Sequence, residues 1–336
     1  MAPASRVNGI LNGTAKGGGM ARSAGNPAFI LGTEQADTLG IGPGDAVIFA
    51  GSGGDAIWAG RGAQLIDAGD GDDDIWTDDG DQTVLGGAGG DAIWSDDTGP
   101  KVLIGGGGDD AIWAGYGAQT VLGGDGRDAI WGGDGPQLLS GGDGNDGIWG
   151  GAGDQTVLGG AGDDVIYTRG GGLFTYYPGR ALACGEEGND TIFATRGADT
   201  ALGGAGNDTL LSSARPSDTA PQFLDGGAGN DLFVAGHANA TLTGGAGRDT
   251  FAFSVDADRR VVVADFRAGQ DVIQFRAAAL WPWPPPTVPP PAVTVSAAPG
   301  PDGDAVLHFG DGATVTLLDV PAARVAAHLA DYVKAG

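Results

Sequence analysis

The sequence is poor in positive charge and has a single cysteine. Lys and Arg together number 17 against 43 Asp and Glu, which gives the 336-residue chain a formal net charge of −26. This excess argues against charge-driven binding to nucleic acid or anionic membranes and favours a cation as partner. The lone Cys184 excludes an internal disulfide. No run of 18 apolar residues occurs, so no membrane span is expected, and the segment Met1 to Met20 lacks the apolar stretch of a cleavable signal.

Catalytic motifs are also missing. The three histidines form no H-E-x-x-H pair, no G-x-S-x-G elbow occurs, and no lysine follows a phosphate-loop pattern. We therefore expect no enzyme activity, and the 31 residues that precede the repeats are too few for a catalytic domain. The alternative, an enzyme, would need a cleft formed by the insertion Thr168 to Cys184, where Tyr176, Tyr177 and Arg180 cluster.

What the sequence has in abundance is glycine, arranged in a nine-residue repeat. Glycine makes up 68 of the 336 residues. Units such as Ala50–Trp58 (AGSGGDAIW), Gly86–Trp94 (GGAGGDAIW) and Gly123–Trp131 (GGDGRDAIW) recur in phase from about Gly32 to Ala252. They resemble the G-G-x-G-x-D-x-U-x nonapeptide of the RTX (repeats-in-toxin) calcium-binding family. That resemblance implies a β-roll that binds calcium and is secreted by a type I system.

A second period of 18 residues lies over the first. Units with Asp at the sixth position alternate with units that carry Gln there, such as Ala59–Asp67 (AGRGAQLID). If each unit is one turn and one short strand, two units make one coil and all Asp turns share one edge. The sequence thus predicts an all-β fold, a right-handed parallel β-roll (β-solenoid) with 18 residues per coil and a C-terminal β cap. The sixth positions of the Asp edge are Asp37, Asp55, Asp73, Asp91, Asp110, Asp128, Asp146, Asp164, Asp190, Asp208, Asp231 and Asp249.

These Asp residues are the predicted metal ligands. Ca²⁺ takes about six to eight oxygens from carboxylates and carbonyls, and strands about 4.8 Å apart bring successive Asp residues close enough to bracket an ion. Twelve Asp turns leave at most eleven gaps, and eleven Ca²⁺ would offset nearly all of the formal charge of −26. The alternative is that these turns are merely solvated.

The opposite edge has different chemistry. Its sixth positions are Ala46, Gln64, Gln82, Pro100, Gln119, Gln137, Gln155, Asp199 and Ala240. A neutral amide offers one oxygen and no charge, so we expect few ions or none there and a hydrogen-bonded Gln ladder instead. Asp199 could hold a local ion. The alternative is that backbone carbonyls bind Ca²⁺ on both edges.

The residues after each turn alternate between the interior and the surface. The eighth position points inward: Leu39, Ile48, Ile57, Ile66, Ile75, Val84, Ile93, Val102, Ile112, Val121, Ile130, Leu139, Ile148, Val157 and Ile166. The ninth position after the Asp turns points outward and is aromatic: Trp58, Trp76, Trp94, Trp113, Trp131, Trp149 and Tyr167. Small residues at the seventh position leave room for these rings to lie over the sheet.

This outward aromatic row admits three interpretations. The rings could only stack on one another, they could form a protein interface for self-association, or they could stack against the sugar rings of a polysaccharide.

Five segments follow along the chain: an N-terminal segment (1–31) that is flexible or involved in assembly, the β-roll (32–252), capping strands (253–280), a Pro-rich loop (281–301), and a C-terminal hairpin and helix similar to a secretion signal (302–336). The insertions Thr168 to Cys184 and Ser212 to Asp225 replace turns of the Gln edge. We expect a secreted, calcium-binding structural or adhesive protein of the cell surface or extracellular matrix that folds on Ca²⁺ binding and forms a homo-oligomer or filament.

Overall fold

The computed structural model describes residues 10–12, 27–95, 98–168, 179–195, 197–213, 220–254, 260–276, 293–298, 303–309 and 312–335. They form two compact units: unit 1 contains the described residues up to Ala161, and unit 2 contains those from Gly162 onward. The predicted Pro-rich loop 281–301 and the N-terminal segment 1–31 lie largely outside the described residues, as do Tyr176 and Tyr177.

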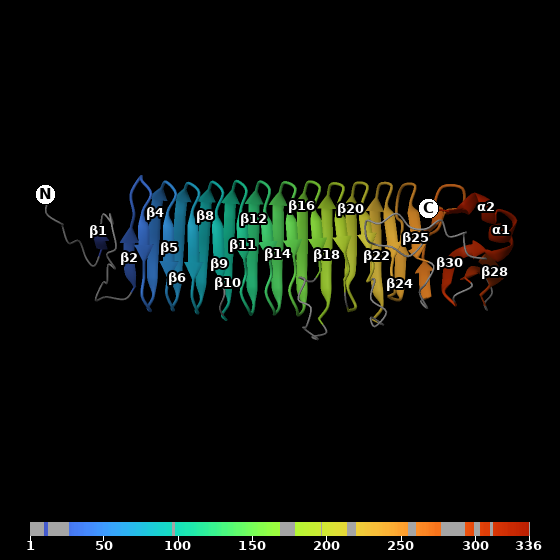
Figure 1. Cartoon of the computed structure of the whole chain (residues 1–336), viewed down its shortest axis with the longest axis horizontal. Coiled ribbons are helices and arrows are strands. Elements are labelled where there is room, and N and C mark those ends of the chain that lie inside the picture. The colour runs from blue at the N-terminus through green and yellow to red at the C-terminus, as the bar shows by residue number, and fades with distance from the viewer. Residues whose placement is uncertain are drawn as a thin grey trace. The chain divides into compact units, whose positions relative to one another are not determined.

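Unit 1 is a parallel β-solenoid in which strands stack in chain order (Figure 1). One sheet contains β1 (Ile10–Asn12), β2 (Ala28–Leu31), β4 (Ala46–Ser52), β6 (Gln64–Asp70), β8 (Gln82–Ala88), β10 (Lys101–Gly107), β12 (Gln119–Asp125), β14 (Gln137–Asp143) and β16 (Gln155–Ala161). The other contains β3 (Thr38–Gly40), β5 (Ala56–Ala59), β7 (Asp74–Thr77), β9 (Ala92–Ser95), β11 (Ala111–Trp113), β13 (Ala129–Trp131) and β15 (Gly147–Trp149). Equivalent residues pair at a spacing of 18, as Gln119 does with Gln137.

Unit 2 repeats this architecture. Its first sheet contains β18 (Ala181–Glu187), β20 (Thr200–Ala205), β22 (Gln222–Ala228), β24 (Ala240–Thr243), β26 (Arg260–Val263) and β30 (Thr314–Pro321). Its second contains β17 (Val165–Tyr167), β19 (Thr191–Phe193), β21 (Thr209–Leu211), β23 (Leu232–Ala235), β25 (Thr250–Ser254), β27 (Val272–Arg276) and β31 (Val333–Ala335). The predicted all-β solenoid with about 18 residues per coil is therefore confirmed.

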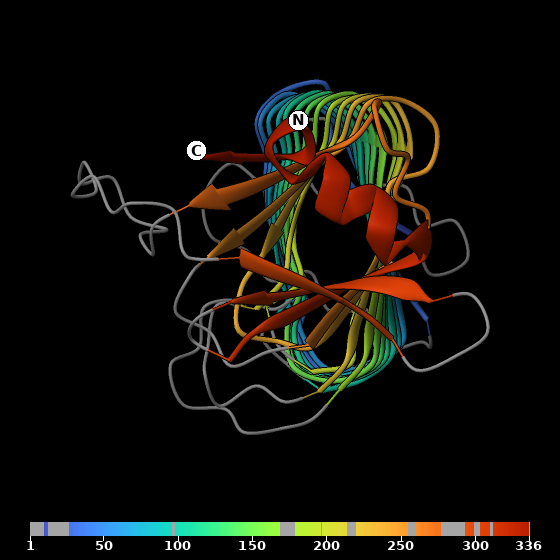
Figure 2. The same cartoon turned by 90° about the vertical axis from the view of Figure 1, so that its right-hand side faces the viewer.

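Unit 2 ends in a mixed cap. β30 pairs in parallel with β26 and antiparallel with β29 (Asp304–Phe309), which pairs antiparallel with β28 (Val293–Ala297). The predicted C-terminal hairpin is thus present, although Gly310 and Asp311 of its turn lie outside the described residues. Two short helices, α1 (Ala322–Ala327) and α2 (Leu329–Tyr332), follow it (Figure 2). Among the described residues, no helix has the length and apolar character needed to cross a membrane.

The core is the predicted stack of aliphatic side chains. Ile93, Ile112 and Ile130 are each 0% exposed and pair directly across β9, β11 and β13. Because side chains alternate with a period of two, a slip of one residue would expose this row to solvent. The register of each coil therefore follows from its inward aliphatic residue.

One coil corrects the predicted register. Lys101, not Pro100, pairs with Gln82 and Gln119, and Leu103 rather than Val102 points inward at 0% exposure. Gly99 has φ +143° and stacks on Gly80, so it occupies the fourth position of the turn. This coil has 19 residues between paired positions instead of 18. The additional residue lies before Gly99, and counting in nines does not show where.

We predict that Ile112→Ala lowers the free energy of unfolding by about 2–5 kcal/mol, because it leaves a cavity in a close-packed core. The control Leu138→Ala removes a side chain that is 37% exposed and should cost less than about 1 kcal/mol. Urea unfolding in saturating Ca²⁺ measures both. Equal losses would contradict the assignment of the core face.

Candidate metal-binding edge

The sixth-position Asp residues form a continuous ladder within each unit. The backbone N–H of Asp73 donates to Oδ1 of Asp91, and that of Asp110 donates to Oδ1 of Asp128. The same contact joins successive Asp residues from Asp37 to Asp146 and from Asp164 to Asp271 at 2.6–3.1 Å. These residues, the Asp ladder, are 0–8% exposed. The carboxylates therefore lie inside the turns, one coil apart.

The second carboxylate oxygen has no such partner along most of the ladder. Within the described residues, Oδ2 is buried without a hydrogen bond in Asp55, Asp73, Asp91, Asp110, Asp128, Asp190, Asp208 and Asp231. A buried ionised carboxylate without a compensating partner is strongly unfavourable. These oxygens call for a positively charged group.

Turn carbonyl oxygens converge on the same places. A Cβ added at Gly86 would lie 2.2 Å from Oδ2 of Asp91 and 2.6 Å from the carbonyl oxygen of Gly105. The equivalent position at Gly123 lies 2.1 Å from Oδ2 of Asp128 and 2.5 Å from the next coil's carbonyl. Glycine leaves this space open at the first position of these two turns, whereas the turns of Asp55 and Asp73 have Ala50 and Ala68 there. A carboxylate oxygen and a carbonyl oxygen from adjacent coils therefore share one small cradle.

The electrostatics agree with this geometry. Burial raises the pKa of Asp91, Asp128 and Asp231 to about 7, against the lowering effect of one backbone N–H, and neighbouring Asp carboxylates raise it further. Burial likewise raises the pKa of Asp73, Asp110 and Asp190 to about 6. Without a counter-charge, the row is hard to keep ionised at neutral pH.

Ca²⁺ fits this donor set, since it takes carboxylate and backbone carbonyl oxygens and tolerates irregular geometry. The Oδ2 atoms of the Asp ladder and the glycine carbonyls beside them would hold it, and it would supply the missing positive charge. Among the described residues, no three His, Cys, Asp or Glu side chains converge on one point. Any ion at this edge would therefore also need backbone carbonyl oxygens as ligands.

The Gln edge satisfies its turn carbonyls without charge. The side-chain amide of Gln137 donates to the carbonyl of Gly115 at 2.9 Å, and that of Gln82 donates to Gly60 at 3.0 Å. The expected contact between neighbouring amides is seen from Gln82 to Gln64 at 3.1 Å. The amides of this edge thus act mainly on backbone carbonyls, which is a different arrangement from the predicted side-chain ladder.

Lys101 interrupts this edge and contributes its own charge. It is 3% exposed, and its Nζ donates to the carbonyl of Asp78 at 2.8 Å. In the other unit, the exceptional Asp199 accepts hydrogen bonds from Thr168 Oγ1 at 2.8 Å and from the Ala181 N–H at 3.0 Å. Neutral donors therefore reach both oxygens of the carboxylate for which we predicted a local ion.

Two residues of these edges were missed in the sequence. Asp271 continues the Asp ladder, since its Oδ1 accepts the Asp249 N–H at 3.1 Å. Gly269, with φ +94°, and Ile273 place it in a G-x-D-x-I pattern that could have revealed it. Gln222 belongs to the Gln edge, because its amide donates to the carbonyl of Ala194. It lies within an insertion, which hid its register.

Six of the eight tryptophans form a second continuous feature, the Trp row: Trp58, Trp76, Trp94, Trp113, Trp131 and Trp149. Successive rings are stacked, with centroids 4.6–5.1 Å apart and planes within 4–7°. In unit 2, Tyr167 stacks on Phe193 at 4.3 Å. A Cβ added at Gly147 would lie 2.8 Å from the ring of Trp149, so that ring lies over the small seventh position as predicted.

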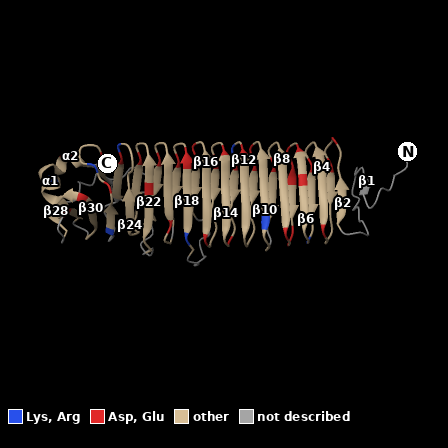
Figure 3. Ribbon diagram, turned by 180° about the vertical axis from the view of Figure 1, so that it is seen from behind, with Lys and Arg blue, Asp and Glu red and all other residues tan. Residues whose placement is uncertain are grey.

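Acidic residues gather where strands meet turns, and basic residues are few (Figure 3). Many of the acidic residues lie at the exposed third and fifth positions of the turns. Asp109, for example, accepts the Arg127 N–H, and Asp163 accepts the Asn189 N–H one coil later. The turns therefore carry an outer row of oxygen atoms that is in contact with solvent and distinct from the buried Asp ladder.

Comparison with known proteins identifies the repeat. The family described as "RTX calcium-binding nonapeptide repeat (4 copies)" matches residues 41–75, 102–130, 113–148, 131–166, 149–172, 185–214 and 222–251. Among solved structures, the chain is similar to "extracellular lipase LipA from Serratia marcescens", with 19% identity and a TM-score of 0.22 over 71% of this chain. The match covers 40% of the lipase, so the chain spans less than half of its length. No curated protein sequence matches the chain.

We predict that Asp128→Asn raises the Ca²⁺ concentration at half-maximal folding several-fold, because it removes a buried negative ligand of the Asp ladder. The matched control is Asp125→Asn, which removes the same charge from an exposed position of the same turn. Circular dichroism during Ca²⁺ titration measures both. An equal shift in the two variants would point to a general charge effect and contradict a specific site.

We also predict that the calcium-free protein gains β structure as the pH falls from 7.5 to 4.5. Burial in the folded state raises the pKa of Asp73 to about 6 and that of Asp91 and Asp128 to about 7, from an ordinary value of 3.8. The folded state therefore binds more protons, so its stability is greatest below about pH 4 and is lost as the pH rises through 6–7. Circular dichroism in chelator tests this, with a Ca²⁺-saturated control that should respond less. A β signal in chelator that grows with pH would show the sign to be wrong.

Proposed function

This chain belongs to the RTX calcium-binding nonapeptide repeat family, and we propose that it is a secreted structural or adhesive protein that folds when it binds Ca²⁺ outside the cell. The observation that carries this proposal is the row of buried Oδ2 atoms in the Asp ladder. Binding free energy at such sites becomes folding free energy. The coils of the Asp ladder that lack an internal counter-charge would stay unfolded during type I export at low internal Ca²⁺ and would fold at the cell surface or in the extracellular matrix.

The Trp row supports self-association as the molecular basis of this role. Trp58 is 45% exposed and the other five indoles are partly exposed, so a continuous aromatic surface covers one sheet of unit 1. Extended exposed apolar surfaces on soluble proteins mark contact sites. Aromatic rings are also enriched at the centres of protein interfaces. We propose that two copies associate through this face in a homo-oligomer, and that the chain has no catalytic activity.

The strand edge at the start of unit 1 offers a second route to assembly. β1 pairs in parallel with β2 through Ile10–Phe29, Leu11–Ile30 and Asn12–Leu31, which places a short strand over the first coil. An end strand has unpaired N–H and C=O groups on its outer side and can pair with another chain. Contacts between solenoid ends would produce a filament, whereas contacts between Trp rows would produce a closed dimer.

The alternative function is polysaccharide binding. The indole planes of the Trp row are nearly parallel from one coil to the next, and their regular spacing of 4.6–5.1 Å gives a long, regular aromatic surface. Aromatic faces pack well against the apolar faces of flat rings. Under this alternative the chain would bind an insoluble glycan as a monomer.

We predict that the Ca²⁺-loaded protein sediments as an oligomer at high concentration and that Trp113→Ala with Trp131→Ala returns it toward the monomer. The control, Leu122→Ala with Leu138→Ala, removes two exposed leucines from the other sheet and should leave the oligomer intact. Analytical ultracentrifugation measures the mass. If the tryptophan variant keeps its oligomeric state but loses retention on an insoluble polysaccharide, the alternative function is correct.

A further inference from the structure

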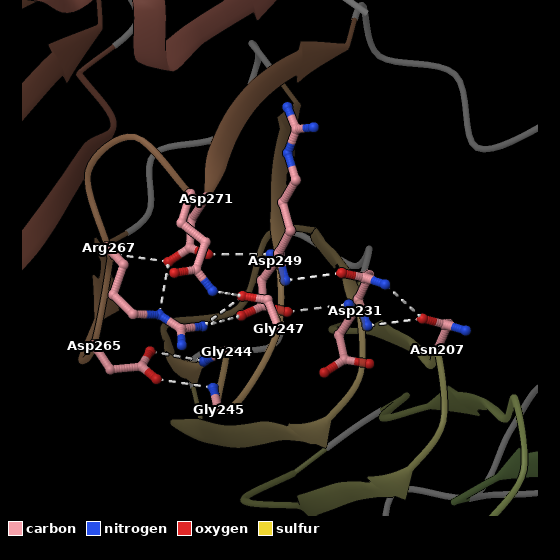
Figure 4. A network of polar contacts seen from close by, with 12 residues as sticks. Asn207, Asp231, Gly244, Gly245, Gly247, Asp249, Asp265, Arg267 and Asp271 are labelled. Carbon is pink, nitrogen blue, oxygen red and sulfur yellow. Dashed lines mark hydrogen bonds and ion pairs between the residues drawn. The ribbon is translucent and has the colours of Figure 1, made fainter.

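The last step of the Asp ladder differs from the steps before it. In unit 2, Oδ2 of Asp190, Asp208 and Asp231 is buried without a hydrogen bond. At Asp249 and Asp271 the same atom has a partner, and in both cases that partner is Arg267 (Figure 4). The chain therefore provides its own positive charge in the gap between these two carboxylates.

The guanidinium contacts both coils of this gap. Nη2 of Arg267 donates to Oδ2 of Asp249 at 3.0 Å and to the carbonyl of Gly247 at 2.8 Å. Nε lies 3.6 Å from Oδ2 of Asp271, which also accepts the Arg267 backbone N–H at 2.6 Å. The amide of Gln270 donates to the same Gly247 carbonyl. Two carboxylates and one turn carbonyl thus surround one cation, which are the ligand types that Ca²⁺ would use in the other gaps.

The sequence of this turn explains how a large side chain enters the ladder. Counting back from Asp271 as the sixth position, Arg267 stands at the second, where most other turns of the Asp ladder have glycine and two have Thr33 and Glu186. A Cβ on Gly245, at that position one coil earlier, would lie 2.0 Å from the carbonyl oxygen of Gly227. The last turn is held differently, because the carboxylate of Asp265 accepts the N–H groups of Gly244 and Gly245 at 2.7 and 2.8 Å. Side-chain contacts replace the close stacking of glycines there.

We propose that the Arg267 guanidinium is an internal cation that takes the place of Ca²⁺ between Asp249 and Asp271. Arg stays charged at any physiological pH, and its planar group can donate to two acceptors at once. The side chains of Asp249 and Asp271 are 0% and 1% exposed, whereas that of Arg267 is 37% exposed. The charge is therefore placed at the mouth of the gap with its donors directed inward.

Two consequences follow for metal binding. The gap between Asp249 and Asp271 takes no Ca²⁺, so the number of bound ions is lower than the number of gaps. The contacts of β25 with β27 also persist without metal, because their counter-charge is covalently part of the chain. The carboxyl-terminal end of the ladder thus remains ordered at Ca²⁺ concentrations that leave the Asp231 gap and earlier gaps open.

Hydrogen exchange of the full-length protein tests this proposal. In chelator, the amides of β27, including Val272, which donates to Asp249 O, should exchange slowly in the wild type, while those beside Asp190 and Asp208 exchange rapidly. Arg267→Gln should speed exchange in β27 on the order of a hundredfold or more, since it leaves two buried carboxylates without a counter-charge. Arg248→Gln, which removes the same charge from an exposed side chain of the preceding turn, should change nothing.

Native mass spectrometry in Ca²⁺ gives an independent readout. Arg267→Gln should bind one more Ca²⁺ than the wild type and than Arg248→Gln, and Ca²⁺ should restore slow exchange to β27 in this variant. The proposal is overturned if Arg267→Gln binds the same number of ions as the wild type, or if β27 of the wild type exchanges as fast in chelator as the rest of the ladder. Neither result depends on self-association, so a failure here is distinct from a failure of the proposed function.

Discussion

The structure depends on how a row of like charges is kept inside a protein. Each coil places one Asp carboxylate within a tight turn, and the next coil places another directly beside it. One oxygen is satisfied by a backbone N–H of the neighbouring coil, as Asp91 Oδ1 is by Asp73. The other oxygen faces a glycine carbonyl, as Asp91 Oδ2 faces Gly105. Repulsion between neighbours and the cost of burial both oppose folding until a cation is present.

The turns at the two edges of each coil satisfy their backbone carbonyl oxygens in different ways. Both turns direct carbonyl oxygens toward the adjacent coil, and these oxygens need donors or cations. On the Gln edge an amide N–H is the donor, as from Gln137 to Gly115. On the Asp edge the side chain is itself an acceptor, so the donor must come from outside the ladder. Alternation of Asp and Gln along the chain therefore divides the solenoid into an edge of charged acceptors and an edge of neutral amides, although Oε1 of Gln82, Gln119 and Gln137 is also buried without a hydrogen bond in the described part of the chain.

Positively charged side chains occur where this alternation breaks. Lys101 takes a Gln position and donates to the Asp78 carbonyl, and Arg267 closes the end of the Asp ladder. Both side chains donate hydrogen bonds to backbone carbonyls, and Arg267 also donates to a carboxylate. The basic residues of this acidic protein are few, yet two of them lie at positions where the turn would otherwise lack a donor.

Much of the fold was predictable because its signal is periodic. The inward row from Ile48 to Ile166 and the separation of Asp and Gln edges both follow from counting residues. Counting failed where a coil changes length: the extra residue before Gly99 shifted the expected register from Pro100 to Lys101. It also failed at Gln222, which lies within an insertion, and at Asp271, whose turn lacks the leading glycines. The contacts of Arg267 depend on side-chain positions that no repeat pattern encodes.

The burial of the second carboxylate oxygen was the feature that could least be predicted from the sequence. The spacing indicated that Asp residues would stack, but it left open whether they face solvent or the interior. In the structure the backbone N–H of each preceding Asp draws the carboxylate inward, which makes the exposed fraction of Asp91 only 1%. This distinction separates a solvated acidic surface from a ladder that requires cations.

A crystal structure of the Ca²⁺-loaded protein, with ions located by their anomalous scattering, tests the central claim most directly. The account predicts ions in the gaps between successive residues of the Asp ladder within each unit, and amide contacts without ions along Gln64, Gln82, Gln119 and Gln137. Ions distributed equally over both edges, or a folded protein with carboxylates of the Asp ladder in contact with no cation, would contradict it.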